Sequence, residues 1–238
     1  MNYIKQISSK YAAKNMGEIV KTLLMSDQVK VIHVVNSQGI NDENYWFETA
    51  ESIGTLAPME EDQTGNKTGR KFTDIKYPWH TKSASFSHSN TRQPLHTDGS
   101  YESKAPNITF FSCIETPTFG GKTTFVELKI LIDYIKAFDS NLLERLEKEI
   151  VTHGKGDDSK TKPIIQNNKI TWNYFRCESC KIRDDFHNFL ENYVVGGDLC
   201  SGITLLPGEA LFFKDEELLH GRTSFIGRRW LLKGGIHV

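Results

Sequence analysis

Residues 93–101 read QPLHTDGSY, and this segment determines how the rest of the chain is interpreted. It places His96 and Asp98 two positions apart, so on an extended strand both side chains leave the same face. An imidazole and a carboxylate that converge in this way can hold a metal ion, and a mixed nitrogen and oxygen set suits iron(II). A surface turn at Asp98 and Gly99, with a solvated His96, is the competing interpretation of the same residues.

A second informative segment, LLPGEALFFKDEELLHGRTSFIGRRWLLKGG, covers residues 205–235. Two β runs flank a turn at Pro207 and Gly208, and His220 begins the next element. At that place His220 is a candidate third ligand for the metal. A structural histidine is the alternative.

Arg228 and Arg229 lie in an otherwise largely apolar β run. On a strand they point to opposite faces, so one can enter a barrel while the other stays in solvent. A buried guanidinium needs an anion, and the far carboxylate of a metal-chelating dicarboxylate suits bidentate recognition. An ordinary ion pair with Glu216 or Glu217 is the alternative.

The segment TFGGKTTF, residues 118–125, contains two adjacent glycines. Gly120 and Gly121 permit a tight turn before a strand. The hydroxyl of Thr123 can then donate a second hydrogen bond to the same carboxylate.

Length and composition predict one globular domain over residues 1–238, because 38% hydrophobic and 11% aromatic content suffices for one sizeable core. The 29 basic and 30 acidic residues nearly cancel, so we expect neither a nucleic-acid nor a membrane partner. The start of the chain lacks the apolar core of a signal peptide, and we expect a cytoplasmic protein. The pair Cys177 and Cys180 is expected to be free thiols; a zinc site with His187 is the alternative.

Periodicity and turn residues predict the following elements. Helices are expected at Met16–Met25, Asp42–Ile53 (capped by Asn41), Leu128–Phe138, Asn141–Ile150 and Asp184–Val194. Strands are expected at Val29–Val35, Asn107–Ile114, Lys122–Val126, Ile170–Phe175, Ile203–Leu206, Ala210–Phe213 and Arg229–Ile236, and loops at Glu61–Arg70 and Gly154–Lys162. The strands do not alternate with helices as βαβ units require. We therefore predict an α+β, mainly β protein whose core is a double-stranded β-helix, or jelly roll, with flanking helices.

Taken together and in this order, LHTDGSY, GGKT, LLHGR and RRWLLK resemble the taurine dioxygenase and clavaminate synthase-like family of iron(II)/2-oxoglutarate oxygenases. The resemblance runs from about Val29 to the C-terminus. It implies that His96, Asp98 and His220 hold iron(II). It also implies that Arg229 and Thr123 bind the far carboxylate of the cosubstrate 2-oxoglutarate, with Arg228 as the fallback for Arg229.

Three further residues lie where this family places substrate contacts: Arg92, Tyr101 and Lys233. Lys233 replaces a frequent arginine four residues after the cosubstrate arginine, so it keeps the charge but loses the bidentate fork. The alternative is that these three are exposed polar residues near a loop, with no role in substrate binding.

The resemblance implies a dioxygenase that hydroxylates an unactivated C–H bond of a small molecule, consumes O2 and 2-oxoglutarate, and releases succinate and CO2. Asp98 favours hydroxylation over halogenation, because related halogenases carry a small residue there. Desaturation or ring closure, the identity of the substrate and the oligomeric state stay open. An amino acid, a sulfonate and a carrier-bound intermediate are all compatible substrates. The rival hypothesis is a non-catalytic jelly-roll binding or regulatory protein that keeps the scaffold.

Overall fold

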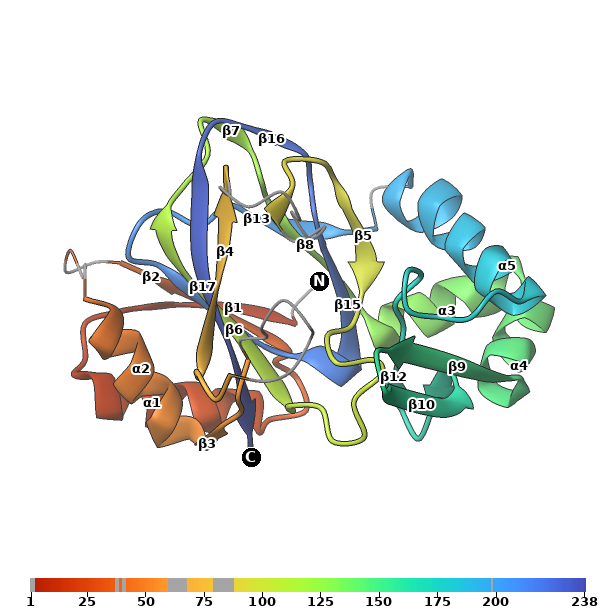
Figure 1. The fold of residues 1–238 in the computed structure, drawn as a ribbon, viewed down its shortest axis with the longest axis horizontal. Helices are drawn as coiled ribbons and strands as arrows, with labels where there is room; N and C mark the ends of the chain where they lie inside the picture. Colours follow the sequence, from red (N-terminus) through yellow and green to blue (C-terminus); the bar gives the residue numbers. More distant parts are fainter. Residues whose placement is uncertain (1–2, 37–38, 40–41, 60–67, 79–87, 198) are drawn as a thin grey trace.

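Two β-sheets form the centre of the protein (Figure 1). The computed structural model describes residues 3–36, 39, 42–59, 68–78, 88–197 and 199–238. The larger sheet has the strand order β1 (Ile4–Ser8), β2 (Val31–Val35), β14 (Ala210–Lys214), β6 (Ile108–Glu115), β17 (Arg229–His237) and β3 (Thr55–Leu56), and β4 (Phe72–Tyr77) also pairs with β17. The smaller sheet has the order β13 (Ser201–Ile203), β8 (Thr123–Glu127), β15 (Leu218–Arg222) and β5 (Gln93–His96).

Alternating side chains build the interior between the two sheets. Phe111 of β6 and Phe213 of β14 point inward, where they meet Phe125 of β8 and Leu218 of β15 in one buried cluster. The next residue along β14, Phe212, belongs to the cluster on the opposite face of the large sheet. This period of two is what a sheet buried on both faces requires.

Helices cover the outer faces of both sheets (Figure 1). The helices α1 (Ala13–Leu24) and α2 (Glu43–Ile53) bury Met16, Val20 and Trp46 against the large sheet.

The outer face of the small sheet is covered by a separate group of elements. These are α3 (Leu128–Phe138), α4 (Ser140–Lys148), α5 (Lys181–Phe189) with its π-helical extension (Leu190–Val195), and the paired strands β9 (Ile150–Lys155) with β10 (Asp158–Pro163) and β11 (Ile165–Gln166) with β12 (Lys169–Ile170). The expected mainly β jelly roll with flanking helices is confirmed.

Several local predictions were wrong. The expected loop Gly154–Lys162 is mostly a β-hairpin, because β10 exposes a polar face and lacks the apolar alternation by which strands are recognised. The expected strand Ile170–Phe175 keeps only Ile170 in regular pairing, since the following backbone turns to hydrogen-bond Thr97. Ile150 opens β9 instead of closing a helix.

Other differences concern ends and short strands. The helix α2 is capped by Asp42, whose side chain accepts a hydrogen bond from Asn44 N, whereas the expected cap, Asn41, lies outside the described residues. Most of the expected loop Glu61–Arg70 also lies outside them. Pattern analysis missed β1, β4 and β15. Among the described residues, no helix is both long and apolar enough to cross a bilayer.

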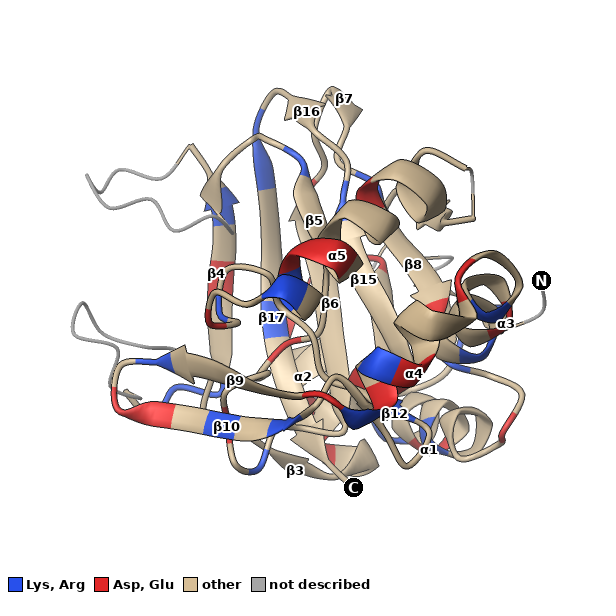
Figure 2. Ribbon diagram, turned by 90° about the vertical axis from the view of Figure 1, so that its right-hand side faces the viewer, with Lys and Arg blue, Asp and Glu red and all other residues tan. Residues whose placement is uncertain are grey.

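Charged residues of both signs are interspersed over α4, α5 and β10, as the colours of the ribbon in Figure 2 show. Several of them form ion pairs, such as Arg145 with Asp185. This mixture agrees with the near-zero net charge of the sequence.

Candidate active site

Two histidines face each other across the smaller sheet. The strands β5 and β15 pair antiparallel, with His96 directly opposite His220. Their ring centroids lie 4.3 Å apart, and both residues are buried. Directly opposed residues on neighbouring strands have the shortest side-chain separation that a sheet offers. Strand pairing therefore brings together two imidazoles from distant parts of the chain.

Asp98 completes the cluster from the turn that follows β5. The structure combines the two interpretations of this segment: Asp98 belongs to a turn, in which Gly99 has a φ of +58°, yet its side chain faces the histidines. Asp98 Oδ1 lies 3.8 Å from His96 Nε2, and Asp98 Oδ2 lies 3.6 Å from His220 Nε2. The three candidate ligand atoms lie within 4.8 Å of one another.

The protonation states of these three residues suit a metal ion. Burial lowers the pKa of both His96 and His220 to about 4, so near pH 7 each imidazole is neutral and can offer a lone pair, although Gln93 Nε2 lies 3.2 Å from His96 Nε2 and would have to give up this contact. Burial alone would raise the pKa of Asp98, but the Lys233 ammonium, 2.6 Å away, and the two imidazoles hold it below its ordinary value.

One oxygen of this cluster lacks a partner. Asp98 Oδ2 is buried and has no hydrogen-bond donor within the described residues. Two neutral imidazole nitrogens and an ionised carboxylate with an unsatisfied oxygen fit a divalent cation such as iron(II).

Each histidine ring has an oxygen atom near its Nδ1, on the side away from Asp98. His96 Nδ1 lies 2.9 Å from the carbonyl oxygen of Pro94, and His220 Nδ1 lies 3.1 Å from Asp215 Oδ1. Both Nε2 atoms thereby face the centre of the cluster. Sequence analysis did not single out Asp215, because an acid in the run DEE before a strand is ordinarily solvated.

Arg229 is buried beside a small cavity. The cavity is lined by Thr123, Gly121, Leu231 and other residues of β6, β8 and β17 with their flanking turns. Burial lowers the pKa of Arg229 to about 9, and among the residues that the structure describes no carboxylate lies within ion-pairing distance of its guanidinium. A buried cation without a counter-ion is suited to bind an anion.

The neighbouring arginine points the other way. Arg228 is exposed, and its Nε lies 3.1 Å from Glu115 Oε1. The acids that sequence analysis considered as arginine partners bind lysines instead: Glu216 pairs with Lys169, and Glu217 pairs with Lys30. Of the two adjacent arginines, only Arg229 can reach a ligand inside the barrel.

The adjacent glycines form the predicted turn. Gly120 and Gly121 have φ values of +77° and +70°, and a Cβ on Gly120 would lie 2.1 Å from the carbonyl oxygen of Ser224. The chain leaves this turn into β8, where Thr123 is buried and faces the same cavity as Arg229.

The three expected substrate contacts have different surroundings. The ammonium group of Lys233 lies 2.6 Å from Asp98 Oδ1 and so contacts a candidate metal ligand. The half-buried Tyr101 accepts a hydrogen bond of 3.3 Å from Lys155 Nζ. Arg92 is exposed and forms an ion pair with Glu191 of the π-helix, so only Lys233 touches a candidate metal ligand.

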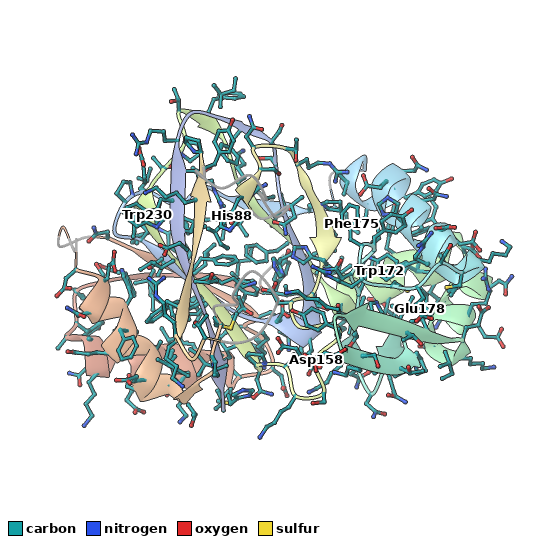
Figure 3. The ribbon with its side chains drawn as sticks, in the orientation of Figure 1. His88, Asp158, Trp172, Phe175, Glu178 and Trp230 are labelled. Carbon is teal, nitrogen blue, oxygen red and sulfur yellow. The ribbon has the colours of Figure 1, made fainter. Side chains whose placement is uncertain are left out.

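The segment after β12 borders the site. Trp172 lies between β5 and the β9–β10 hairpin (Figure 3), and its backbone exchanges hydrogen bonds with Thr97, the residue between the two ligands of the β5 segment. In the alternative zinc site, Cys177 and Cys180 are free cysteines and His187 stacks on Tyr174. Within the described ranges, His96, Asp98 and His220 form the only cluster of His, Cys, Asp and Glu side chains that could hold a metal ion.

Comparison with known proteins agrees with this arrangement. The family described as taurine catabolism dioxygenase TauD, TfdA family matches residues 18–234. No curated protein matches by sequence. Similar solved structures include PvcB from Pseudomonas aeruginosa, with a TM-score of 0.73, 15% identity, and coverage of 100% of this chain and 87% of that chain.

Two other similar structures are enzymes in complex with ligands. An asparagine oxygenase with Fe(II), 3-hydroxyasparagine and succinate has a TM-score of 0.69, 11% identity, and coverage of 99% of this chain and 93% of that chain. The non-heme iron oxygenase OrfP with Fe, succinate and dihydroxyarginine has a TM-score of 0.68, 11% identity, and coverage of 93% and 80%. At these identities the likeness shows the shared fold. The expected class, an iron(II)- and 2-oxoglutarate-dependent dioxygenase, is confirmed because the chain belongs to the taurine catabolism dioxygenase TauD, TfdA family.

Proposed function

We propose that this protein hydroxylates an unactivated C–H bond of a small, amino acid-like molecule, and that His96, Asp98 and His220 are its iron ligands. The observation that carries the ligand assignment is the convergence of two neutral imidazoles on a carboxylate whose buried oxygen lacks a partner. When bound, iron(II) and 2-oxoglutarate supply the oxidation: O2 and 2-oxoglutarate are consumed, and succinate, CO2 and the hydroxylated product are released.

We propose that Arg229 and Thr123 bind the far carboxylate of 2-oxoglutarate. The register of the smaller sheet supports this role, because β8 places Phe125 opposite His220 and Thr123 two residues further along the same face. Two residues of a strand span about 7 Å. A five-carbon diacid that binds the metal with one end can bridge a distance of this order to Thr123 and to Arg229 in the adjoining cavity.

The fork of Arg229 would form two charge-assisted hydrogen bonds with that carboxylate, and the Thr123 hydroxyl would donate a third. Leu205 and Leu231 make part of the cavity wall apolar, which would strengthen these charge-assisted bonds.

The substrate class is a proposal supported by chemistry and analogy. The asparagine oxygenase and OrfP contain hydroxylated amino acids. In this protein Lys233 and Tyr101 are the candidate contacts for an anionic or polar substrate group, whereas Arg92 would first have to leave Glu191. A cytoplasmic location and a single domain over residues 1–238 stay predictions.

The first test is anaerobic addition of iron(II) and 2-oxoglutarate, which should produce a visible charge-transfer band in the wild type and none in His96→Ala or Asp98→Ala. Glu216→Gln is the control and should keep the band, because Glu216 pairs with the exposed Lys169. The second test is a succinate-release screen over amino acids and other small molecules, with mass detection of one added oxygen. Undiminished succinate formation in both ligand variants would remove the ligand assignment.

A further inference from the structure

Asp215 is a buried acid to which no direct role in the reaction has been given. It opens a short 3-10 helix, Asp215–Glu217, that joins β14 to β15. Glu216 binds the exposed Lys169 and Glu217 binds the buried Lys30, whereas Asp215 is only 1% exposed and pairs with no lysine among the described residues. Burying a carboxylate is unfavourable unless donors compensate for the lost water, so its inward placement calls for a specific partner.

Both oxygens of Asp215 face candidate iron ligands. The backbone N–H of Asp98 donates to Asp215 Oδ2 at 2.7 Å. Asp215 Oδ1 lies 3.1 Å from His220 Nδ1, and neither atom forms a hydrogen bond within the described residues, so each is the nearest candidate partner of the other. One side chain thus contacts both the turn after β5 and the strand β15, which supply different ligands.

The chemistry of imidazole decides which atom donates in the contact between His220 and Asp215. A histidine that offers its Nε2 lone pair to a metal carries its ring hydrogen on Nδ1, and this N–H must donate to an acceptor. His96 has such an acceptor in the carbonyl oxygen of Pro94. For His220 the acceptor within reach is Asp215 Oδ1.

We infer that Asp215 is a positioning residue of the metal centre: it accepts one hydrogen bond from His220 Nδ1–H and one from the Asp98 backbone, and so fixes the ring tautomer and the place of both ligands. The inference rests on the proposed function. A carboxylate can accept both bonds, whereas an amide has one acceptor oxygen and a donor group that opposes the second N–H. Asp215→Asn therefore changes this arrangement with almost no change in volume.

The test uses zinc(II), a diamagnetic stand-in for iron(II), on the full chain. Zinc affinity is measured by competition with a chromophoric chelator in the wild type, in Asp215→Asn, and in Glu216→Gln as the matched control from the same turn. Loss of an outer hydrogen-bond partner of a ligand typically weakens metal binding by about 10- to 100-fold. We expect this loss for Asp215→Asn and a change below about twofold for Glu216→Gln.

A second measurement separates positioning from a general effect on folding. In zinc-loaded protein labelled with ¹⁵N-histidine, the wild type should show His220 protonated at Nδ1, with a ring hydrogen that exchanges slowly with water. In Asp215→Asn this hydrogen should exchange faster, while that of His96 should not change. Should Asp215→Asn fail to fold, the wild-type spectrum decides: fast exchange at His220 Nδ1 overturns the inference.

The two proposals fail in different ways. A wild-type protein that binds neither zinc(II) nor iron(II) overturns the proposed function. A wild-type protein that binds metal, with Asp215→Asn binding it equally well and retaining slow exchange at His220, overturns only the role of Asp215.

Discussion

Replacing Arg229 by methionine should change stability and cosubstrate binding in opposite directions. The guanidinium is buried, and among the described residues no acid pairs with it. In the ligand-free protein this charge is a cost, which is why burial lowers its pKa to about 9. An apolar side chain of similar length removes the cost and still fills the space beside the cavity.

The magnitudes follow from the contacts that are lost. Two charge-assisted hydrogen bonds to a carboxylate are worth about 1.5–3 kcal/mol each, so a loss of roughly 3 kcal/mol is a conservative estimate for Arg229→Met. At about 1.4 kcal/mol per factor of ten, this weakens 2-oxoglutarate binding by about 100-fold. Replacing buried charge by apolar groups gains about 1–4 kcal/mol, and each kcal/mol raises Tm by about 2–4 °C in a chain of this size.

The assay combines two titrations. The affinity for 2-oxoglutarate is read anaerobically from the charge-transfer band of iron-loaded protein, and Tm is read by calorimetry without ligand. Arg228→Met is the matched control, because this adjacent arginine is exposed and pairs with Glu115. It should leave both quantities nearly unchanged. Binding of 2-oxoglutarate by Arg229→Met within threefold of the wild type, or a large loss in Arg228→Met, would refute the assignment.

Three further perturbations test other parts of the structure. Gly221→Ala should lower the free energy of unfolding in urea by about 1–3 kcal/mol and weaken zinc binding, because the new Cβ would lie 2.7 Å from the carbonyl oxygen of Gln93 and push β5 away from β15. An unchanged free energy of unfolding would contradict this close approach. His153→Phe should flatten the loss of stability on acidification. Burial lowers the pKa of His153 to about 4, so between pH 6.5 and 4 only the unfolded chain takes up its proton, which costs the wild type up to about 1.4 kcal/mol per pH unit. Equal slopes in both proteins would contradict that burial effect. Replacing Cys177 and Cys180 by alanine should leave the iron content unchanged, whereas metal loss would favour the zinc alternative.

The fold and the central cluster were largely predictable because each signal was local or periodic. The spacing of His96 and Asp98 defines one side of a strand and turn, and the alternation around Arg229 predicts that it and Arg228 point to opposite faces. The sequence does not show that His96 and His220 lie directly opposite, because strand register depends on the pairing of segments far apart in the chain. The resemblance to a family supplied that information.

Residues whose surroundings come from tertiary contacts could not be predicted in this way. Asp215 looks like its neighbours Glu216 and Glu217 in the run DEE, and only the 3-10 turn directs it inward. Lys233 stays a predicted substrate contact, but its inward direction on β17, which places its ammonium 2.6 Å from Asp98 Oδ1, was not predicted. Neither outcome follows from composition or periodicity.

The two charged side chains that would meet the ligands differ in their compensation: Lys233 pairs with Asp98, whereas Arg229 has no acid partner among the described residues. Asp98 Oδ2 has no hydrogen-bond donor and Arg229 has no acid partner among the described residues, so a metal ion could satisfy the first and a carboxylate the second. A ligand that binds only the folded state stabilises it by RT ln(1 + [L]/Kd), about 2.7 kcal/mol at one hundred times Kd. Because each charge faces a different ligand, the gain from iron(II) should depend on Asp98 and the gain from 2-oxoglutarate on Arg229. The buried charge of Arg229 thus lowers the stability of the folded protein and raises its affinity for a carboxylate.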